Sequence, residues 1–316
     1  MKAQSSFFTL IHNRKPLKCE KFLTEMEAVI PWATMMEEIL PFYQEKERGR
    51  KKTELMLLLK MYFLQQWYGL SDPGIEEAIY DRNSFQKFLG IDPFAHNIPD
   101  ETTVLHFRHM LEENEIQKKI FARIQQLLDQ KGLIVKKGTI VDASIFAAPS
   151  STKNKSKKRD PEMSSTQKNG QWYFGMKGHI GVDADTGVIH SVECTTAKES
   201  DIEHMEELLH GKEKAQFGDK GYSKKELKQK ARKTGIYWGV LDKGQKNHPL
   251  SSSQKRQNRK LSSIRAKVEF PFRVLKCQWK YTKARFKGLK KNAAQLIMLF
   301  GLANIYLTRR QLMYTT

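Results

Sequence analysis

Apolar residues in the first third of the chain repeat at helical spacing. The run from Glu54 to Tyr68 carries Leu, Met and Phe every three to four residues, Thr53 can cap it and Gly69 ends it. Asp72 precedes a proline, as a capping residue before a first helical turn often does. The pattern therefore predicts a series of short helices.

Two more helices follow before residue 130. Ser84 and Gly90 bracket a short one, and Asp100 opens another, with one apolar face made by Val104, Phe107, Met110 and Leu111. Short helices joined by brief turns are compatible with a helix-turn-helix and equally with an ordinary helical bundle. Both interpretations stay open at this point.

After Gly132 the period changes from helix to strand. The β-branched and aromatic run Thr139–Phe146 predicts a strand, and Tyr173–Val182 and Gly187–Thr195 predict a hairpin that turns through residues 183–186. Polar, basic stretches at 150–170 and 243–260 lack apolar periodicity and are expected to be loops.

Helices and strands then alternate. The pattern predicts a helix at 201–209, a strand at 215–217, a basic helix at 223–233 and a strand at 236–241. A helix over Ala293–Leu307 completes the series. Polar residues interrupt it and it falls short of the roughly 20 residues of a membrane span, so it is expected to be a buried core helix. The expected fold class is α/β with a mixed sheet flanked by helices, over residues 131–316, preceded by an all-helical region over residues 1–130.

The charge of the chain indicates the kind of partner it binds. The net charge is +20, and from Lys243 onward 18 Lys and Arg residues stand against one acid, Glu269. Such an excess points to a polyanion, most often nucleic acid.

Three scattered cysteines give neither a disulfide framework nor a zinc ribbon, and the N-terminus lacks the apolar run of a signal peptide, so a cytoplasmic protein is expected.

Two aspartates occupy positions that suit metal-dependent phosphoryl transfer, which needs carboxylates from distant segments to meet around divalent ions. Asp142 stands within an apolar strand, where a charge is costly unless it is paired or bound to metal. Asp219 stands between two glycines at a strand end. The alternatives are a solvent-facing strand residue for Asp142 and a turn residue for Asp219.

Glu269 is the third candidate. Arg265 and Lys276 fall within about 40° of its direction on a helix, so all three are expected on one face. A solitary acid in a basic segment can simply neutralise one of these cations, but a metal ligand has to persist where DNA contact disfavours negative charge. Pro271 follows closely, which predicts a distorted helix.

Three segments carry a family resemblance. They are Thr139–Ser144, Phe217–Tyr222 and Ile264–Lys276, and they resemble the catalytic blocks of bacterial insertion-sequence transposases of the Asp-Asp-Glu type, closest to the insertion-sequence-five family. Arg265, Glu269 and Lys276 match a signature of tyrosine, two residues, arginine, three residues, glutamate, six residues and lysine. Its tyrosine position is Ser262 here.

The resemblance implies a ribonuclease-H-like catalytic domain in which Asp142, Asp219 and Glu269 hold two Mg²⁺ or Mn²⁺ ions. It implies nicking at the terminal inverted repeats of a mobile element and attack of the freed 3′-hydroxyl on target DNA. Arg265 and Lys276 would hold phosphates near the cut. The partner would be double-stranded DNA in the bacterial nucleoid, bound by a homodimer without a nucleotide cofactor or a membrane.

Further DNA contacts are expected from exposed basic and polar residues. These are Lys157, Lys158 and Arg159 in one predicted loop, Arg256 and Arg259 in the other, and Thr102, Thr103 and His106 on a helix of the N-terminal region. Aromatic residues Trp172, Tyr173 and Phe174 can stack on unpaired bases or pack in the core.

Other candidates are weaker. Asp183 and Asp185 are expected to serve a hairpin turn, and His179 is expected to be packed. No phosphate loop or nucleophile elbow is present in the sequence. Two other function classes stay open: a metal-dependent DNA nuclease without strand transfer, and a non-catalytic DNA-binding regulator.

Overall fold

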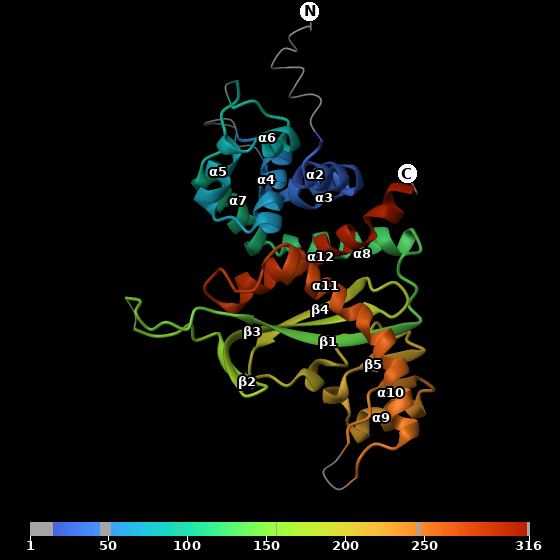
Figure 1. Ribbon diagram of the computed structural model, residues 1–316. Coiled ribbons are helices and arrows are strands. Elements are labelled where there is room, and N and C mark those ends of the chain that lie inside the picture. The colour runs from blue at the N-terminus through green and yellow to red at the C-terminus, as the bar shows by residue number, and fades with distance from the viewer. Residues whose placement is uncertain (1–14, 45–51, 94, 156, 245–247, 315–316) are drawn as a thin grey trace, which may run out of the picture.

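A computed structural model describes residues 15–44, 52–93, 95–155, 157–244 and 248–314. Its N-terminal region is helical, as Figure 1 shows. The helices are α2 (Lys18–Val29), α3 (Trp32–Ile39), α4 (Leu55–Tyr68), α5 (Asp72–Asp81), α6 (Asn83–Leu89), α7 (Glu101–Glu113) and α8 (Ile116–Gln130), with a 3-10 turn, η1 (Leu40–Phe42).

The helix ends follow from local chemistry, with two corrections. Gly69 ends α4 in the left-handed conformation, as glycine readily does, and the Asp100 carboxylate accepts a hydrogen bond from the Thr103 N–H to cap α7. Thr53 is not the cap of α4, because the helix begins one residue later, after Glu54. Asp72 is the first residue of α5 and Ser71 caps it, since the Ser71 hydroxyl accepts from the Gly74 N–H.

A six-stranded mixed sheet forms the second part of the chain. Its strands are β1 (Gly138–Ala147), β2 (Ser164–Lys168), β3 (Gln171–Asp183), β4 (Ile189–Thr196), β5 (Ala215–Gly218) and β6 (Tyr237–Val240). The main order is β2-β3-β1-β5-β6, and β4 also pairs with β3. β1 runs antiparallel to β3 and parallel to β5, which makes the sheet mixed, as predicted.

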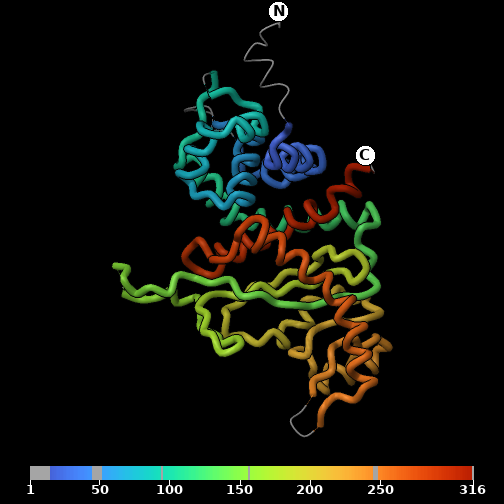
Figure 2. Tube along the Cα trace, in the orientation of Figure 1, coloured from blue at the N-terminus to red at the C-terminus, as the bar shows by residue number. Residues whose placement is uncertain are grey.

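Helices cover both faces of this sheet. α12 (Leu289–Tyr314) lies across one face beside α8, and most of its buried residues belong to the main core (Figure 2). The opposite face carries the segment after β4 and α9 (Lys225–Lys233), around a smaller core of Val141, Met205, Leu208, Tyr222 and Val240. A mixed sheet between helical layers is the ribonuclease-H-like arrangement.

Three predicted elements differ from the structure. The expected loop at 150–170 contains β2, whose exposed residues are ordered by pairing with β3. The expected helix at 201–209 forms only a 3-10 turn, η2 (Asp201–His204), followed by turns. The expected loop at 243–260 contains the first part of α10 (Ser252–Arg265), which Ser251 and Gln254 start with a capping box.

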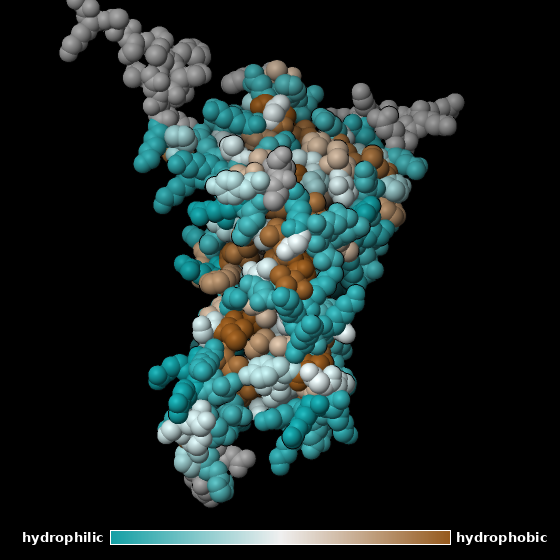
Figure 3. All heavy atoms as spheres, turned by 90° about the vertical axis from the view of Figure 1, so that its right-hand side faces the viewer, coloured by the Kyte–Doolittle hydropathy of each residue, from teal (hydrophilic) through white to brown (hydrophobic). Residues whose placement is uncertain are grey.

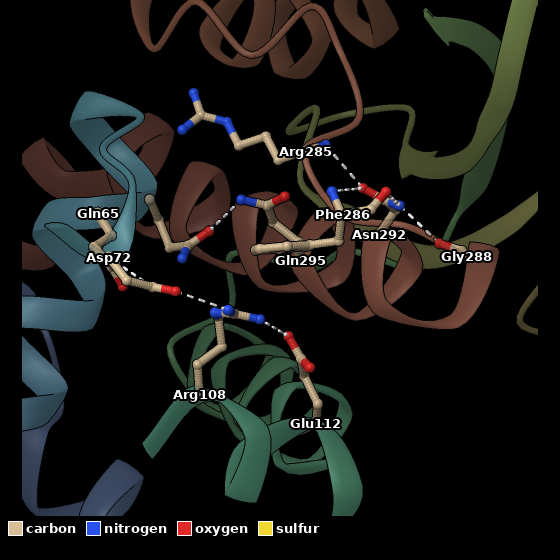
Figure 4. A network of polar contacts seen from close by, with 10 residues as sticks. Gln65, Asp72, Arg108, Glu112, Arg285, Phe286, Gly288, Asn292 and Gln295 are labelled. Carbon is tan, nitrogen blue, oxygen red and sulfur yellow. Dashed lines mark hydrogen bonds and ion pairs between the residues drawn. The ribbon is translucent and has the colours of Figure 1, made fainter. Parts of the chain in front are cut away.

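A polar network joins the helical region to the C-terminal segment (Figure 4). Arg108 of α7 is buried, and its guanidinium pairs with Asp72 and Glu112 at 2.9 Å each. It also lies 4.2 Å from the centre of the Phe286 ring, in the loop before α12. The Asn292 side chain, in the first turn of α12, accepts from the backbone N–H groups of 285 and 286 in that loop, which fixes the entry into the helix.

Among the residues that the structure describes, no helix is long and apolar enough to cross a membrane.

Candidate active site

Asp142 lies on β1, and Asp219 directly follows the neighbouring strand β5. β1 and β5 are parallel, and Ile140 pairs with Phe217. Asp142 follows two residues later on β1 and Asp219 two residues later in the turn after β5, so the pairing brings the two aspartates close enough for the charge of Asp219 to raise the pKa of Asp142. The sequence could mark each aspartate, but only the strand pairing brings them together.

Asp142 is largely buried. Its side chain is 19% exposed, and its Oδ1 accepts a hydrogen bond from the Ala143 N–H at 2.9 Å. Burial raises the pKa of Asp142 to about 6, although Arg265 and the Ala143 N–H act in the opposite direction, and the charge of Asp219 adds to the rise. A divalent cation beside this buried carboxylate would stabilise its charged form.

Asp219 sits in the turn that ends β5. Its Oδ1 accepts from the Gly221 N–H at 2.7 Å and caps the short 3-10 turn η3 (Lys220–Tyr222). A Cβ at Gly221 would approach this oxygen to 2.8 Å, so a larger residue there would make the Asp219 carboxylate shift. Tyr222, which the sequence analysis did not single out, is buried below the turn, and burial, together with the charges of nearby aspartates that include Asp142 and Asp219, raises the pKa of its phenol.

Glu269 begins a distorted stretch of helix, as Pro271 predicts. α10 is followed by a 3-10 turn, η4 (Ala266–Val268), then by α11 (Glu269–Arg273) and by a π-helix, η5 (Val274–Gln278). Pro271 has no N–H, so it cannot donate within this stretch and the regular hydrogen-bond ladder is interrupted. The Glu269 side chain is 63% exposed.

Arg265 connects the acids on this face of the sheet. Its Nη2 lies 3.3 Å from Asp142 Oδ2, and its Nη1 lies 3.4 Å from Glu269 Oε1. One guanidinium therefore spans carboxylates that are 127 positions apart in the chain. Glu269 thus lies on the same side of the sheet as Asp142.

Lys276 packs against β1. Its Nζ donates to Ser144 Oγ at 2.6 Å and to the Ile145 carbonyl at 2.7 Å, and it lies 4.7 Å from the centre of the Phe146 ring. Burial lowers the pKa of the Lys276 ammonium. Ser144, which the sequence did not single out, stands two residues after Asp142 and therefore on the same face of the strand.

β5 pairs with β1 only as far as Ile140, so the edge of β1 beyond this residue needs other hydrogen-bond partners. Asp142 accepts from the Ala143 N–H, Lys276 donates to the Ile145 carbonyl, and the backbone of residues 282–284 bonds to Ala147. These bonds satisfy an otherwise open strand edge and fix the direction of Asp142.

The predicted DNA-contact residues do not all gather at the acids. Arg256 and Arg259 are exposed on α10, the helix that leads to Arg265. Lys157, Lys158 and Arg159 are exposed in the segment between β1 and β2, and Arg159 donates to the Ser150 carbonyl. Thr102, Thr103 and His106 lie on α7, where Thr102 and His106 are exposed and Thr103 is half-buried.

Carboxylate oxygens are the donors that Mg²⁺ and Mn²⁺ prefer, and the buried charge on Asp142 fits such an ion. Within the described ranges, however, no three His, Cys, Asp or Glu side chains stand close enough together to hold one metal ion. The Arg265 guanidinium lies between Asp142 and Glu269 instead. The carboxylate donors are chemically suited to a divalent ion, and in this arrangement Arg265 is the group that contacts both Asp142 and Glu269.

Comparison with known families agrees with this geometry. Residues 134–305 match the model of a transposase DDE domain, and residues 11–110 match a second model, described as a transposase domain (DUF772). The first match covers more than half of the chain and contains all three acids. The chain belongs to the DDE transposase family.

Both matches are typical of insertion-sequence transposases, and the transposase assignment follows from them. The closer affiliation with the insertion-sequence-five family stays a prediction. In this DDE domain the weaker candidates have structural roles. Asp183 accepts from two backbone N–H groups of its own turn and from two of the segment before β1, and His179 is fully buried with its Nε2 2.8 Å from Thr195 Oγ1.

Proposed function

We propose that this transposase nicks DNA at the ends of an insertion sequence and joins the freed 3′-hydroxyl to target DNA, with Asp142, Asp219 and Glu269 as the metal-holding carboxylates. The observation that carries the proposal is the pairing of β1 with β5, at the end of which Asp142 and Asp219 interact electrostatically. Arg265 adds to it, because this residue contacts Asp142 and Glu269 at once.

Each residue has a defined task in this proposal. Two Mg²⁺ or Mn²⁺ ions, when bound, would activate the attacking oxygen and stabilise the leaving oxygen. Asp142 would supply oxygens from β1, Asp219 from the turn after β5, and Glu269 from the start of α11. Arg265 and Lys276 would hold phosphates beside the cut once they leave their carboxylate and strand partners.

DNA would be positioned by the rest of the chain. Residues 1–130 would recognise the terminal inverted repeats, with Thr102, Thr103 and His106 of α7 among the contacts, and residues 131–316 would carry out catalysis. Lys157, Lys158 and Arg159 and, on α10, Arg256 and Arg259 would contact the phosphate backbone. The expected working form is a homodimer on DNA in the bacterial cytoplasm.

Strand joining tests this function most sharply. The purified chain is incubated in Mg²⁺ with a duplex taken from the DNA that flanks its gene, in which the strand to be transferred is labelled at its 5′ end, and with an unlabelled target plasmid. The expected product is label covalently attached to the plasmid. Cleavage without any joining would leave a metal-dependent nuclease, and binding without cleavage would leave a DNA-binding regulator.

A further inference from the structure

Helix α9 presents a row of cations to solvent. Five of its nine residues are Lys or Arg and one is an acid. On helical spacing, Lys225, Lys228 and Arg232 fall within about 60° of one another. All three are exposed, and within the described part of the chain none of them forms an ion pair, whereas Lys230 of the same helix pairs with Glu206.

This row lies on the opposite side of the sheet from the proposed catalytic acids. The inner face of α9 packs through Leu227 against the small core that contains Val141. Val141 and Asp142 are neighbours on β1, so their side chains point to opposite faces. In Figure 1, α9 accordingly lies below the sheet and α11 and α12 lie above it. The row therefore cannot hold the phosphates next to Asp142.

The surface suits a polyanion better than a protein partner. α9 exposes no large apolar side chain, and stable protein interfaces need an apolar centre. The lower end of the face in Figure 3, where α9 and α10 lie, is mostly hydrophilic, and the apolar patches are concentrated further up. Cations on a rigid helix release counterions when they contact duplex phosphates.

We propose that Lys225, Lys228 and Arg232 bind the backbone of target DNA, a second duplex besides the element end, at a distance from the phosphate that reacts at the acids. This inference rests on the proposed function, which requires the enzyme to hold an element end and a target together. Contacts to phosphate alone carry no sequence information, so this surface would accept targets of any sequence.

The salt dependence of DNA binding tests this surface. Affinity of the full chain for a fluorescein-labelled duplex of mixed sequence is measured by anisotropy in EDTA, from about 50 to about 200 mM salt. Each lost phosphate contact flattens the plot of log affinity against log salt by about 0.9. The variant K228Q/R232Q is expected to flatten it by roughly 1.8, and K225Q alone by roughly 0.9.

A matched control removes the same charge elsewhere. Lys290 and Lys291 are exposed in the first turn of α12, on the other side of the sheet, and K290Q/K291Q is expected to keep the wild-type slope. An unchanged slope in K228Q/R232Q, or an equal loss in both variants, would overturn the proposal.

The role of target binding has its own readout. In the joining assay, K228Q/R232Q is expected to lower the ratio of joined to nicked product several-fold, and K290Q/K291Q is expected to keep it. A normal ratio together with a flattened slope would overturn the assignment to target DNA. If the wild type does not nick at all, the proposed function fails, while the salt slopes still decide whether α9 binds DNA.

Discussion

Arg265 Nη2 lies 3.3 Å from Asp142 Oδ2, so a guanidinium occupies the neighbourhood in which a divalent cation is proposed to bind. The same guanidinium holds Glu269, the third acid of the set. Metal entry therefore competes with an ion pair within the protein. When the pair opens, the acids become free for metal and Arg265 becomes free for a phosphate.

Removing the Arg265 charge is expected to tighten metal binding in the absence of DNA. In R265Q the two carboxylates lose their cation, and an affinity for Mn²⁺ about tenfold higher corresponds to about 1.4 kcal/mol. Titration calorimetry at pH 8 measures it. The control is R273Q, since Arg273 is exposed on α11 and forms no ion pair within the described residues. Equal or weaker binding by R265Q would contradict the competition.

The buried Asp142 carboxylate is expected to destabilise the metal-free fold at neutral pH. Its pKa rises from 3.8 in the unfolded chain to about 6 in the folded one. Below pH 3.8 the Asp142 carboxyl is protonated in the folded and the unfolded state, so it costs no stability. Between these values the unfolded state ionises first, so stability falls as pH rises, and the loss is complete above about pH 6.

The variant D142N removes this loss. In EDTA it is expected to be more stable than the wild type by about 1 to 3 kcal/mol at pH 8, and by little near pH 4. Urea unfolding at both pH values measures the difference. D81N, at an exposed position on α5, serves as the control. A less stable D142N at pH 8 would show that the Asp142 carboxylate stabilises the fold.

Arg108 of α7 is expected to stabilise the helical region by pairing with Asp72 of α5 and with Glu112 of α7. In R108M the Asp72 and Glu112 carboxylates lose their common partner, and leaving charges unpaired in a buried site costs about 3 kcal/mol. Thermal unfolding measures the loss against R310M, which changes an exposed arginine on α12. Equal stability of the two variants would show that the network contributes little.

The sequence predicts the sheet well because its strands carry strong local signals. β1, β3 and β4 are β-branched or alternating runs bounded by glycine and aspartate, and the structure confirms them. β2 was missed because its stability comes from β3 and not from its own polar residues. The start of α10 was missed because, of its 14 residues, only Leu261 is buried, although the Ser251 and Gln254 capping box could have marked it.

The candidate residues can be picked out from the sequence, but their arrangement cannot. Asp142, Asp219 and Glu269 stand out by position, and the distortion after Glu269 follows from Pro271. The pairing of β1 with β5, the Arg265 bridge and the contact of Lys276 with Ser144 depend on long-range packing. No local pattern encodes them. The catalytic and DNA-binding roles of these residues stay predictions.

Strand cleavage by single-acid variants tests the central claim most directly. D142A, D219A and E269A are compared with the wild type in Mg²⁺, on a plasmid that carries the DNA flanking the gene, with binding to the same DNA measured in EDTA. The expected result is loss of nicking in all three variants and binding close to that of the wild type. Wild-type nicking by any one of them would contradict its assignment as a metal-holding carboxylate.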